Sequence, residues 1–167
     1  MAEQSSTTII SKDVDRICVD DVIAFFDDSR SSSCVPDTKD FYSNIVGGHL
    51  SVDKIQRGRV TCFFSVKPAV LNFYGGAHGG AVAAVAERMA IACARTVVAA
   101  DKEIFLGELS VSYLSAAPEN SELIVEGSVV RSGKNVTMVA VDFKLKQSGK
   151  LVYTCHATFY NTPVAKL

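Results

Sequence analysis

The sequence predicts an α+β domain in which an antiparallel six-stranded sheet curls round one long central helix. The stretch from Ala81 to Ala100 is built of small apolar residues without proline or glycine, which is typical of a buried helix. Two segments before it and four after it alternate between apolar and polar residues, as strands do. Because one apolar helix accompanies six strands, we expect it to cover a single face of the sheet.

An extra N-terminal helix is expected ahead of the sheet, because apolar residues recur at three- and four-residue steps between Asp13 and Ser29. We therefore divide the chain into an N-terminal tail with an amphipathic helix (residues 1–43), a main domain (44–162) and a C-terminal tail (163–167). Residues 1 to 12 are polar and are predicted to lack regular structure.

The strands of the main domain are predicted from alternation and from turn chemistry, and the period-two pattern begins at Ile45. Short turns rich in glycine and serine separate the last three strands, and the last four strands are predicted to form a meander. The six predicted strands span residues 49–55, 58–66, 104–115, 122–131, 135–146 and 150–161.

Composition excludes several classes of protein. Hydrophobic residues make up 48% of the 167 residues, which excludes disorder over most of the length. With 17 basic and 18 acidic residues the net charge is −1, so there is no electrostatic case for a nucleic-acid partner. The five cysteines are far apart and form no C-x-x-C pair, which indicates reduced thiols rather than a disulfide framework or a metal site.

Two further features bear on location. The central helix carries Glu87 and Arg88 near its middle, which argues against stable membrane insertion. The C-terminal tripeptide Ala165-Lys166-Leu167 is close to the S-K-L peroxisomal signal. We therefore expect a peroxisomal location if this signal is read and a cytoplasmic one otherwise; a simple frayed tail is the alternative.

Glu87 is the only acidic residue of the predicted central helix. It is either a solvated carboxylate beside Arg88 or a general base or nucleophile. Gly79 and Gly80 at the start of the helix offer free backbone N–H groups at the positive end of the helix dipole, which suits a developing oxyanion. A general base that activates water and a group that binds an oxyanion are the two features that acyl transfer to water requires.

The spacing of these groups adds a constraint. Gly79 and Glu87 are eight residues apart, which is about 12 Å along a helix at 1.5 Å per residue. One carbonyl group cannot contact both within a single chain. If both act on it, they come from two subunits related by a two-fold axis, which makes two identical sites.

The pattern Asn72-x-x-Gly75-x-x-His78-Gly79-Gly80, followed by an acid at Glu87, resembles that of the PaaI-like group of hotdog-fold acyl-CoA thioesterases. A sheet curled round one apolar helix is also what the hotdog fold describes. The resemblance covers about residues 45 to 160. It implies a hydrolase of fatty acid metabolism that assembles as a homodimer, and as a homotetramer built of two dimers.

The resemblance implies catalytic roles for four residues. Glu87 would activate water or attack the thioester, the Gly79 N–H would polarise the thioester carbonyl, and Asn72 would position water or the carbonyl from the partner's loop. His78 would contact substrate or only shape the loop, and we favour the second role. Asn72 has an ordinary turn residue as its alternative.

The chain departs from that pattern at two places. The similar relatives have aspartate at the position of Glu87, although other hotdog thioesterases use glutamate there. A serine on the following strand assists in those relatives, and its ungapped match here is Leu106, with Ser110 and Ser112 as weak substitutes. These two departures bear on the fine geometry of the site and on the choice of substrate more than on whether the protein is active.

CoA carries phosphates, and the turn after the fourth predicted strand offers two cations and backbone N–H groups. A merely solvated turn is the alternative. The resemblance implies CoA contacts at this turn and at two tyrosines, so that the implied set is Tyr113, Arg131, Ser132, Gly133, Lys134, Asn135, Val136 and Tyr160. CoA would enter as part of the substrate, and no separate cofactor or metal is expected.

Two other functions stay open from the sequence. A non-catalytic acyl-CoA-binding protein would keep the fold and lose the reaction. A hotdog hydratase or dehydratase would also use a helix acid and a histidine, but the proline-rich loop typical of such dehydratases is missing before the helix. The acyl group of the substrate does not follow from the sequence.

Overall fold

A computed structural model of the chain describes residues 9–10, 23, 26 and 41–163. Ile23 and Phe26 are helical, and the rest of the predicted N-terminal helix lies outside the described residues, as does the tripeptide 165–167. The described elements, in chain order, are β1 (Ile9–Ile10), α2 (Phe41–Gly48), β2 (Leu50–Gln56), β3 (Arg59–Ser65), the 3-10 turn η1 (Pro68–Val70), α3 (Gly79–Arg95), β4 (Lys102–Tyr113), β5 (Glu122–Ser132), β6 (Val136–Leu145) and β7 (Leu151–Pro163).

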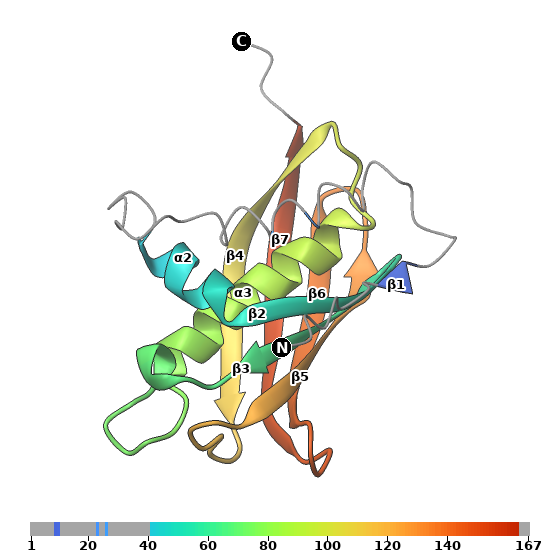
Figure 1. Cartoon of the computed structure of the whole chain (residues 1–167). Coiled ribbons are helices and arrows are strands. Elements are labelled where there is room, and N and C mark those ends of the chain that lie inside the picture. The colour runs from blue at the N-terminus through green and yellow to red at the C-terminus, as the bar shows by residue number, and fades with distance from the viewer. Residues whose placement is uncertain (1–8, 11–22, 24–25, 27–40, 164–167) are drawn as a thin grey trace.

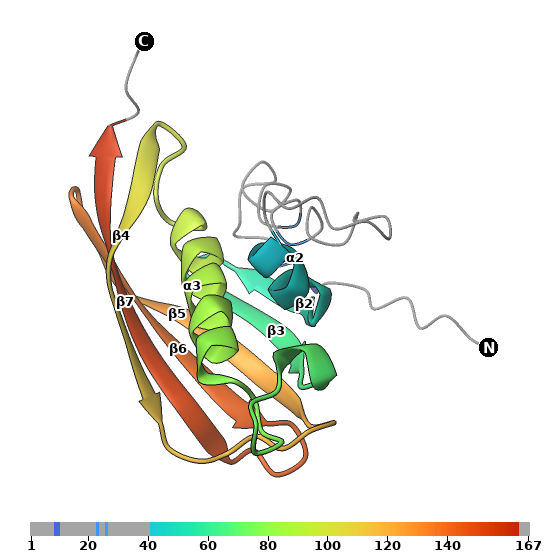
Figure 2. The same ribbon diagram turned by 90° about the vertical axis from the view of Figure 1, so that its left-hand side faces the viewer.

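One twisted sheet bends round α3, as Figure 1 shows, and α2 lies on the side of α3 away from β4 and β7 (Figure 2). The strand order is β1-β2-β3-β5-β6-β7-β4. The six strands β2 to β7 pair antiparallel, as predicted from the sequence. The two-residue β1 pairs in parallel with β2, although a tail without regular structure was predicted there.

The predicted meander of the last four strands is wrong for its first member. β5, β6 and β7 are neighbours joined by short turns, but β4 pairs with β7 at the edge of the sheet. The connection of residues 114–121 is too long for a tight hairpin. It crosses the end of the sheet through a bridge between Gly76 and Pro118 and delivers β5 to β3.

Helix α3 ends five residues earlier than its apolar run suggests. Thr96 is the C-terminal capping residue, and its hydroxyl donates to the carbonyl of Cys93 at 2.7 Å and accepts from the N–H of Gly58 at 2.7 Å. The buried face of α3, which includes Met89, packs against the inner face of β5 and β6, which includes Phe143. None of the described helices has the length and apolar character needed to cross a bilayer.

Helix α2 lies where the sequence predicted the start of the period-two pattern, so the prediction for residues 45–48 is wrong. Its sequence FYSNIVGG has low intrinsic helix propensity. Val46 is 2% exposed and α2 packs on α3, so tertiary burial rather than propensity stabilises this helix.

Candidate active site at the start of helix α3

The N-terminus of α3 is capped by His78. Its imidazole Nδ1 accepts a hydrogen bond from the N–H of Gly80 at 3.0 Å, and its backbone is extended, as capping residues are. An accepting Nδ1 requires the neutral ring with its proton on Nε2, so the Nε2–H can still donate. This bond is of the kind that a loop-shaping role for His78 requires, and the role itself stays a prediction.

Gly79 differs from Gly80, although both were predicted to offer free N–H groups. The Gly80 N–H is bound by His78, whereas the Gly79 N–H has no hydrogen-bond partner among the described residues. The carbonyl of Gly79 accepts a hydrogen bond from the Tyr113 hydroxyl at 2.8 Å. Of the two glycine N–H groups, that of Gly79 is therefore the one left open at the positive end of α3 within the described part of the chain, and the bond from Tyr113 restrains Gly79 at its carbonyl.

Tyr113 connects this helix terminus to the sheet. A Cβ atom built on Gly79 would lie 3.2 Å from the Tyr113 hydroxyl oxygen, so the ring packs directly against the glycine. The ring meets Tyr153 edge-on at 5.7 Å, and the Tyr153 hydroxyl accepts from the N–H of Ala117 at 3.0 Å. Burial raises the pKa of Tyr113, which keeps its hydroxyl protonated and able to donate near neutral pH.

Asn72 organises the loop before α3. Its Oδ1 accepts from the N–H groups of Tyr74 at 2.9 Å and Gly76 at 3.1 Å, and its Nδ2 donates to the Ala77 carbonyl at 3.3 Å. These bonds favour the structural role of Asn72 within its own chain. The second Nδ2 hydrogen is not used by the loop, so one donor remains for a water or a carbonyl group.

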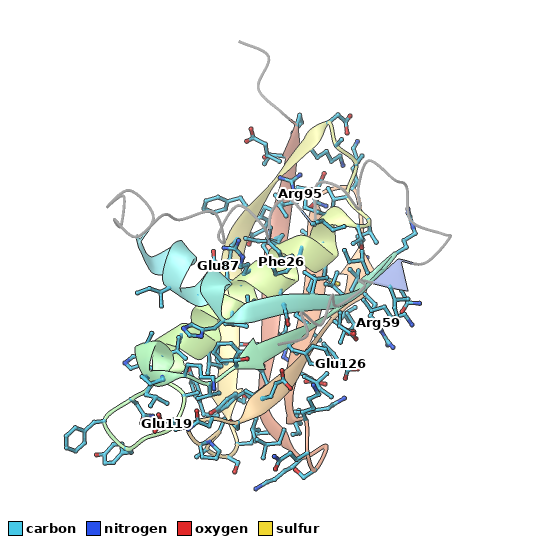
Figure 3. The ribbon with its side chains drawn as sticks, viewed as in Figure 1. Phe26, Arg59, Glu87, Arg95, Glu119 and Glu126 are labelled. Atoms are coloured by element: carbon cyan, nitrogen blue, oxygen red, sulfur yellow. The ribbon has the colours of Figure 1, made fainter. Side chains whose placement is uncertain are left out.

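Glu87 lies in the middle of α3 and is half-buried (Figure 3). The neighbouring Arg88 places its guanidinium 5.7 Å from the ring centre of Phe26, which is buried against the helix. Arg88 thus packs against Phe26, and both interpretations of Glu87, as a solvated carboxylate and as a general base or nucleophile, stay predictions.

The structure brings the four predicted catalytic residues only partly together. Asn72, His78 and Gly79 lie at the start of α3, in one loop that leads into the helix. Glu87 is about 12 Å further along the helix axis, at 1.5 Å per residue. No single carbonyl can reach both ends within one chain.

The predicted CoA turn lies at the opposite end of α3. Arg95, in the last turn of α3, donates from Nη1 to the carbonyl of Lys102 at 2.8 Å, and the Lys102 ammonium donates to the carbonyl of Lys134. Residues 131–135 are exposed and Val136 is half-buried. Val136 pairs with Tyr160 across β6 and β7, so these predicted CoA contacts form one group.

Tyr113 does not belong to that group. Along β4, Phe105 pairs with Tyr160 and Tyr113 pairs with Tyr153, eight residues away. At about 3.3 Å per residue the two predicted tyrosines are roughly 26 Å apart. They also lie on opposite faces of the sheet, because Tyr113 reaches α3 while Tyr160 is on the outer face.

Ser110 and Ser112 are exposed and alternate with Leu109 and Val111, which pack against the core. They lie on the outer face of the sheet, away from α3.

The sequence analysis did not single out several residues near the start of α3 and near the turn of residues 131–136. Lys102, Thr137 and Asn161 hold the turn, and only Asn161 and Thr137 left a signal, as polar residues on apolar inward positions. Phe73 and Tyr74 were passed over inside the glycine-rich motif, yet they are 97% and 91% exposed.

The cysteines offer no alternative nucleophile in the described part of the chain. Cys62, Cys93 and Cys155 are free and buried. Burial raises the pKa of each thiol, to about 12 for Cys93 and Cys155, so they remain protonated and unreactive. Among the described residues no cluster of three or more histidine, cysteine or acidic side chains could hold a metal ion.

Comparisons with known proteins identify the fold. Residues 74–152 match the family model described as thioesterase superfamily. Thioesterase superfamily member 2 from zebrafish superposes with a TM-score of 0.72 at 19% identity, covering 84% of this chain and 96% of that one. The fold is the hotdog fold.

Two bacterial proteins of similar structure were solved with ligands. A hypothetical thioesterase from Streptococcus pneumoniae, with coenzyme A, has a TM-score of 0.62 at 23% identity and covers 70% of this chain and 88% of that one. A Streptococcus mutans protein bound to acetyl-CoA has a TM-score of 0.59 at 21% identity and covers 70% and 91%. A search of curated protein sequences finds no match.

Proposed function

We propose that the protein is an acyl-CoA thioesterase, which hydrolyses its substrate to a free acid and CoA. The observation that carries the proposal is the open N–H of Gly79 at the start of α3, within the segment of residues 74–152 that matches the thioesterase superfamily. Such an N–H group, placed at the positive end of a helix, suits the oxygen of a thioester carbonyl as it becomes negative. The relatives with CoA and acetyl-CoA support the substrate class.

In the proposed reaction Glu87 removes a proton from water while the water oxygen adds to the thioester carbonyl carbon. The Gly79 N–H donates to the resulting oxyanion. The carbonyl then re-forms, the carbon–sulfur bond breaks, and the departing sulfur takes the proton from Glu87. In the alternative course the Glu87 carboxylate attacks the carbonyl carbon itself, the carbon–sulfur bond breaks, and CoA leaves as its thiolate, which takes up a proton. Water then hydrolyses the mixed anhydride to the free acid and restores the Glu87 carboxylate.

The dimer is part of the proposal, and strand β4 supports it. This 12-residue strand pairs with β7 on one side and is the edge of the sheet formed by the described residues. An edge strand of this length is a template for pairing with another chain. We propose that two copies pair antiparallel through β4, which sets their α3 helices antiparallel.

This arrangement would combine Gly79 of one subunit with Glu87 of the other, and would do so twice in each dimer. Pairing of β4 with its copy brings the Tyr113 end of one strand beside the Lys102 end of the other. The partner's turn of residues 131–136 would then come close to Gly79 and Tyr113, although in one chain they lie at opposite ends of α3. CoA would span the interface, with phosphates on one subunit's turn and the thioester at the other subunit's Gly79.

A complementation experiment tests the shared site. Glu87→Gln and a Gly79→Val variant should each release no thiol from acyl-CoA. Mixed and refolded together, they should recover about a quarter of wild-type activity, because half of the dimers are mixed and each holds one intact site. Sites contained within one chain would give no recovery, and retained turnover by Glu87→Gln would remove Glu87 from the mechanism.

A non-catalytic acyl-CoA-binding protein is the second candidate, and Leu106 favours it. This side chain packs against the core where the similar enzymes have their assisting serine. Acyl-CoA would then raise the melting temperature of the protein without any release of thiol.

We further propose that the chain is specifically similar to acyl-coenzyme A thioesterase 13. We also propose that it assembles as a homotetramer built of two dimers, and that it is located in the peroxisome. The motif from Asn72 to Gly80 supports the likeness, and the tripeptide 165–167 supports the location. Sedimentation analysis measures the assembly. A fluorescent fusion with and without the last three residues tests the location.

A further inference from the structure

The tip of the β5–β6 turn is held by its carbonyl groups. Asn161 donates from Nδ2 to the carbonyl of Gly133 at 3.0 Å and from its backbone N–H to the carbonyl of Asn135 at 2.8 Å. The Lys102 ammonium donates to the carbonyl between them, that of Lys134. Three consecutive carbonyls of an exposed turn thus accept hydrogen bonds from β4 and β7.

A polar network lies beneath this turn. Asn161 is 6% exposed and Thr137 is fully buried. The Asn161 carboxamide and the Thr137 hydroxyl bond each other, at 3.0 Å from Nδ2 and 3.2 Å to Oδ1. The Ser132 hydroxyl lies 3.1 Å from the Thr137 hydroxyl and extends the network to the start of the turn. Leaving a buried amide unpaired is costly, so each member restrains the next.

Asn161 occupies a position where the pattern of the strand calls for an apolar residue. Inward positions 155, 157 and 159 of β7 are Cys, Ala and Phe, all buried. An apolar side chain at 161 would continue the core and leave the Gly133 carbonyl without its donor. The polar residue therefore serves the turn rather than the packing of the sheet.

Restraint by the carbonyl side leaves the other side of the tip free. The backbone N–H groups of Lys134 and Asn135 have no hydrogen-bond partner within the described part of the chain. The side chains of Arg131 and Lys134 are exposed. Two open N–H groups and two cations on a turn that is already ordered suit a phosphate, because little conformational entropy is then lost on binding.

We propose that Asn161, with Thr137 and Lys102, is a positioning residue that preorganises this turn for the phosphates of CoA. The inference rests on the proposed function, because it takes the turn as the nucleotide-binding part of the substrate site. It adds three residues that neither the motif nor the family resemblance assigns.

The test compares acyl-CoA with the same acyl group on pantetheine, which lacks the nucleotide and its phosphates. Asn161→Leu keeps the size of the side chain and removes both donors of the carboxamide. We expect its KM for acyl-CoA to rise about tenfold at unchanged kcat, the effect of losing one charge-assisted contact. Its KM for acyl-pantetheine should stay at the wild-type value.

Two further variants separate positioning from folding. Lys102→Met removes a surface ammonium without touching the core, and it should also raise the KM for acyl-CoA alone. Thr154→Val is the matched control, because Thr154 lies on the outer face of the same strand β7 and its hydroxyl donates to the carboxylate of Asp142 on β6. It should change neither KM. Equal changes on both substrates, or none on either, would overturn the proposed role.

The same variants remain informative if the wild-type protein releases no thiol. That outcome would reject the proposed reaction, and calorimetry with CoA and with pantetheine would then measure binding directly. Weaker CoA binding by Asn161→Leu, with unchanged binding of pantetheine, supports the positioning role. CoA affinity equal to that of the wild type overturns it.

Discussion

Gly79→Ala is the substitution whose outcome the structure defines best. The new Cβ would lie 3.2 Å from the Tyr113 hydroxyl oxygen and 3.3 Å from Cζ, closer than an ordinary contact. Tyr113 is 54% exposed, so its ring can move by a few tenths of an ångström. That movement disturbs the 2.8 Å hydrogen bond to the Gly79 carbonyl, and with it the orientation of Gly79, the residue that carries the open N–H.

The two effects on stability nearly cancel. Gly→Ala at a helical position with ordinary φ stabilises by about 0.4–1 kcal/mol. The weakened hydrogen bond costs about 0.5–1.5 kcal/mol. We therefore expect the free energy of unfolding, measured by urea denaturation, to change by less than about 1 kcal/mol.

Catalysis should be affected more strongly than stability. Removal of an oxyanion donor lowers kcat by about 10²–10³-fold, and a displaced donor should cost less, about tenfold to a hundredfold. Thiol release from acyl-CoA measures this. Gly48→Ala is the matched control, because Gly48 is also helical and a Cβ there meets nothing within 4 Å. A kcat within twofold of wild type for Gly79→Ala would refute the assignment of its N–H as donor to the oxyanion.

Three other outcomes follow from single contacts. His78→Ala removes the acceptor of the Gly80 N–H and should lower the free energy of unfolding by about 1 kcal/mol, whereas His78→Asn should retain most of it. Gly107→Ala places a Cβ 2.2 Å from Cε2 of Tyr160 and should cost about 1–3 kcal/mol; the loss should shrink in a Tyr160→Ala background, and equal losses in both would contradict the contact. Burial, and then the charge of Lys67, lower the pKa of His49 from 6.5, so the unfolded chain binds the proton more readily. Stability should therefore be complete above about pH 6.5 and fall as the pH drops below it, and His49→Gln should remove this part of the pH dependence.

The fold was predictable where local chemistry decides it. Gly133 and Gly149 mark short turns, and short turns make consecutive strands antiparallel neighbours, so the order β5-β6-β7 followed from the sequence. The place of β4 did not, because the connection of residues 114–121 is long and carries no information about its partner strand. Helix α2 was missed for a related reason, since its helicity comes from burial of Val46 and not from propensity.

In the candidate site too, some features could be predicted from the sequence and others could not. Asn72, His78 and Gly79 lie within eight residues of one another, so their loop and cap could be predicted from spacing. Tyr113 reaches Gly79 from 34 residues away in the sequence, and no local pattern indicates such a contact. The separation of Tyr113 from Tyr160 likewise became visible only through the register of β4 with β7.

The buried helix, the six strands, the glycines at the start of α3 and the carboxylate eight residues after Gly79 could all be predicted from the amino-acid sequence. Each of these depends on a period or a spacing that neighbouring residues carry. Three other features came from the three-dimensional structure: β4 is the edge strand among the described strands, the Gly79 N–H and not the Gly80 N–H is open, and the predicted CoA turn lies at the far end of α3 from Gly79. Those features depend on contacts between distant segments, which packing selects and local sequence does not encode.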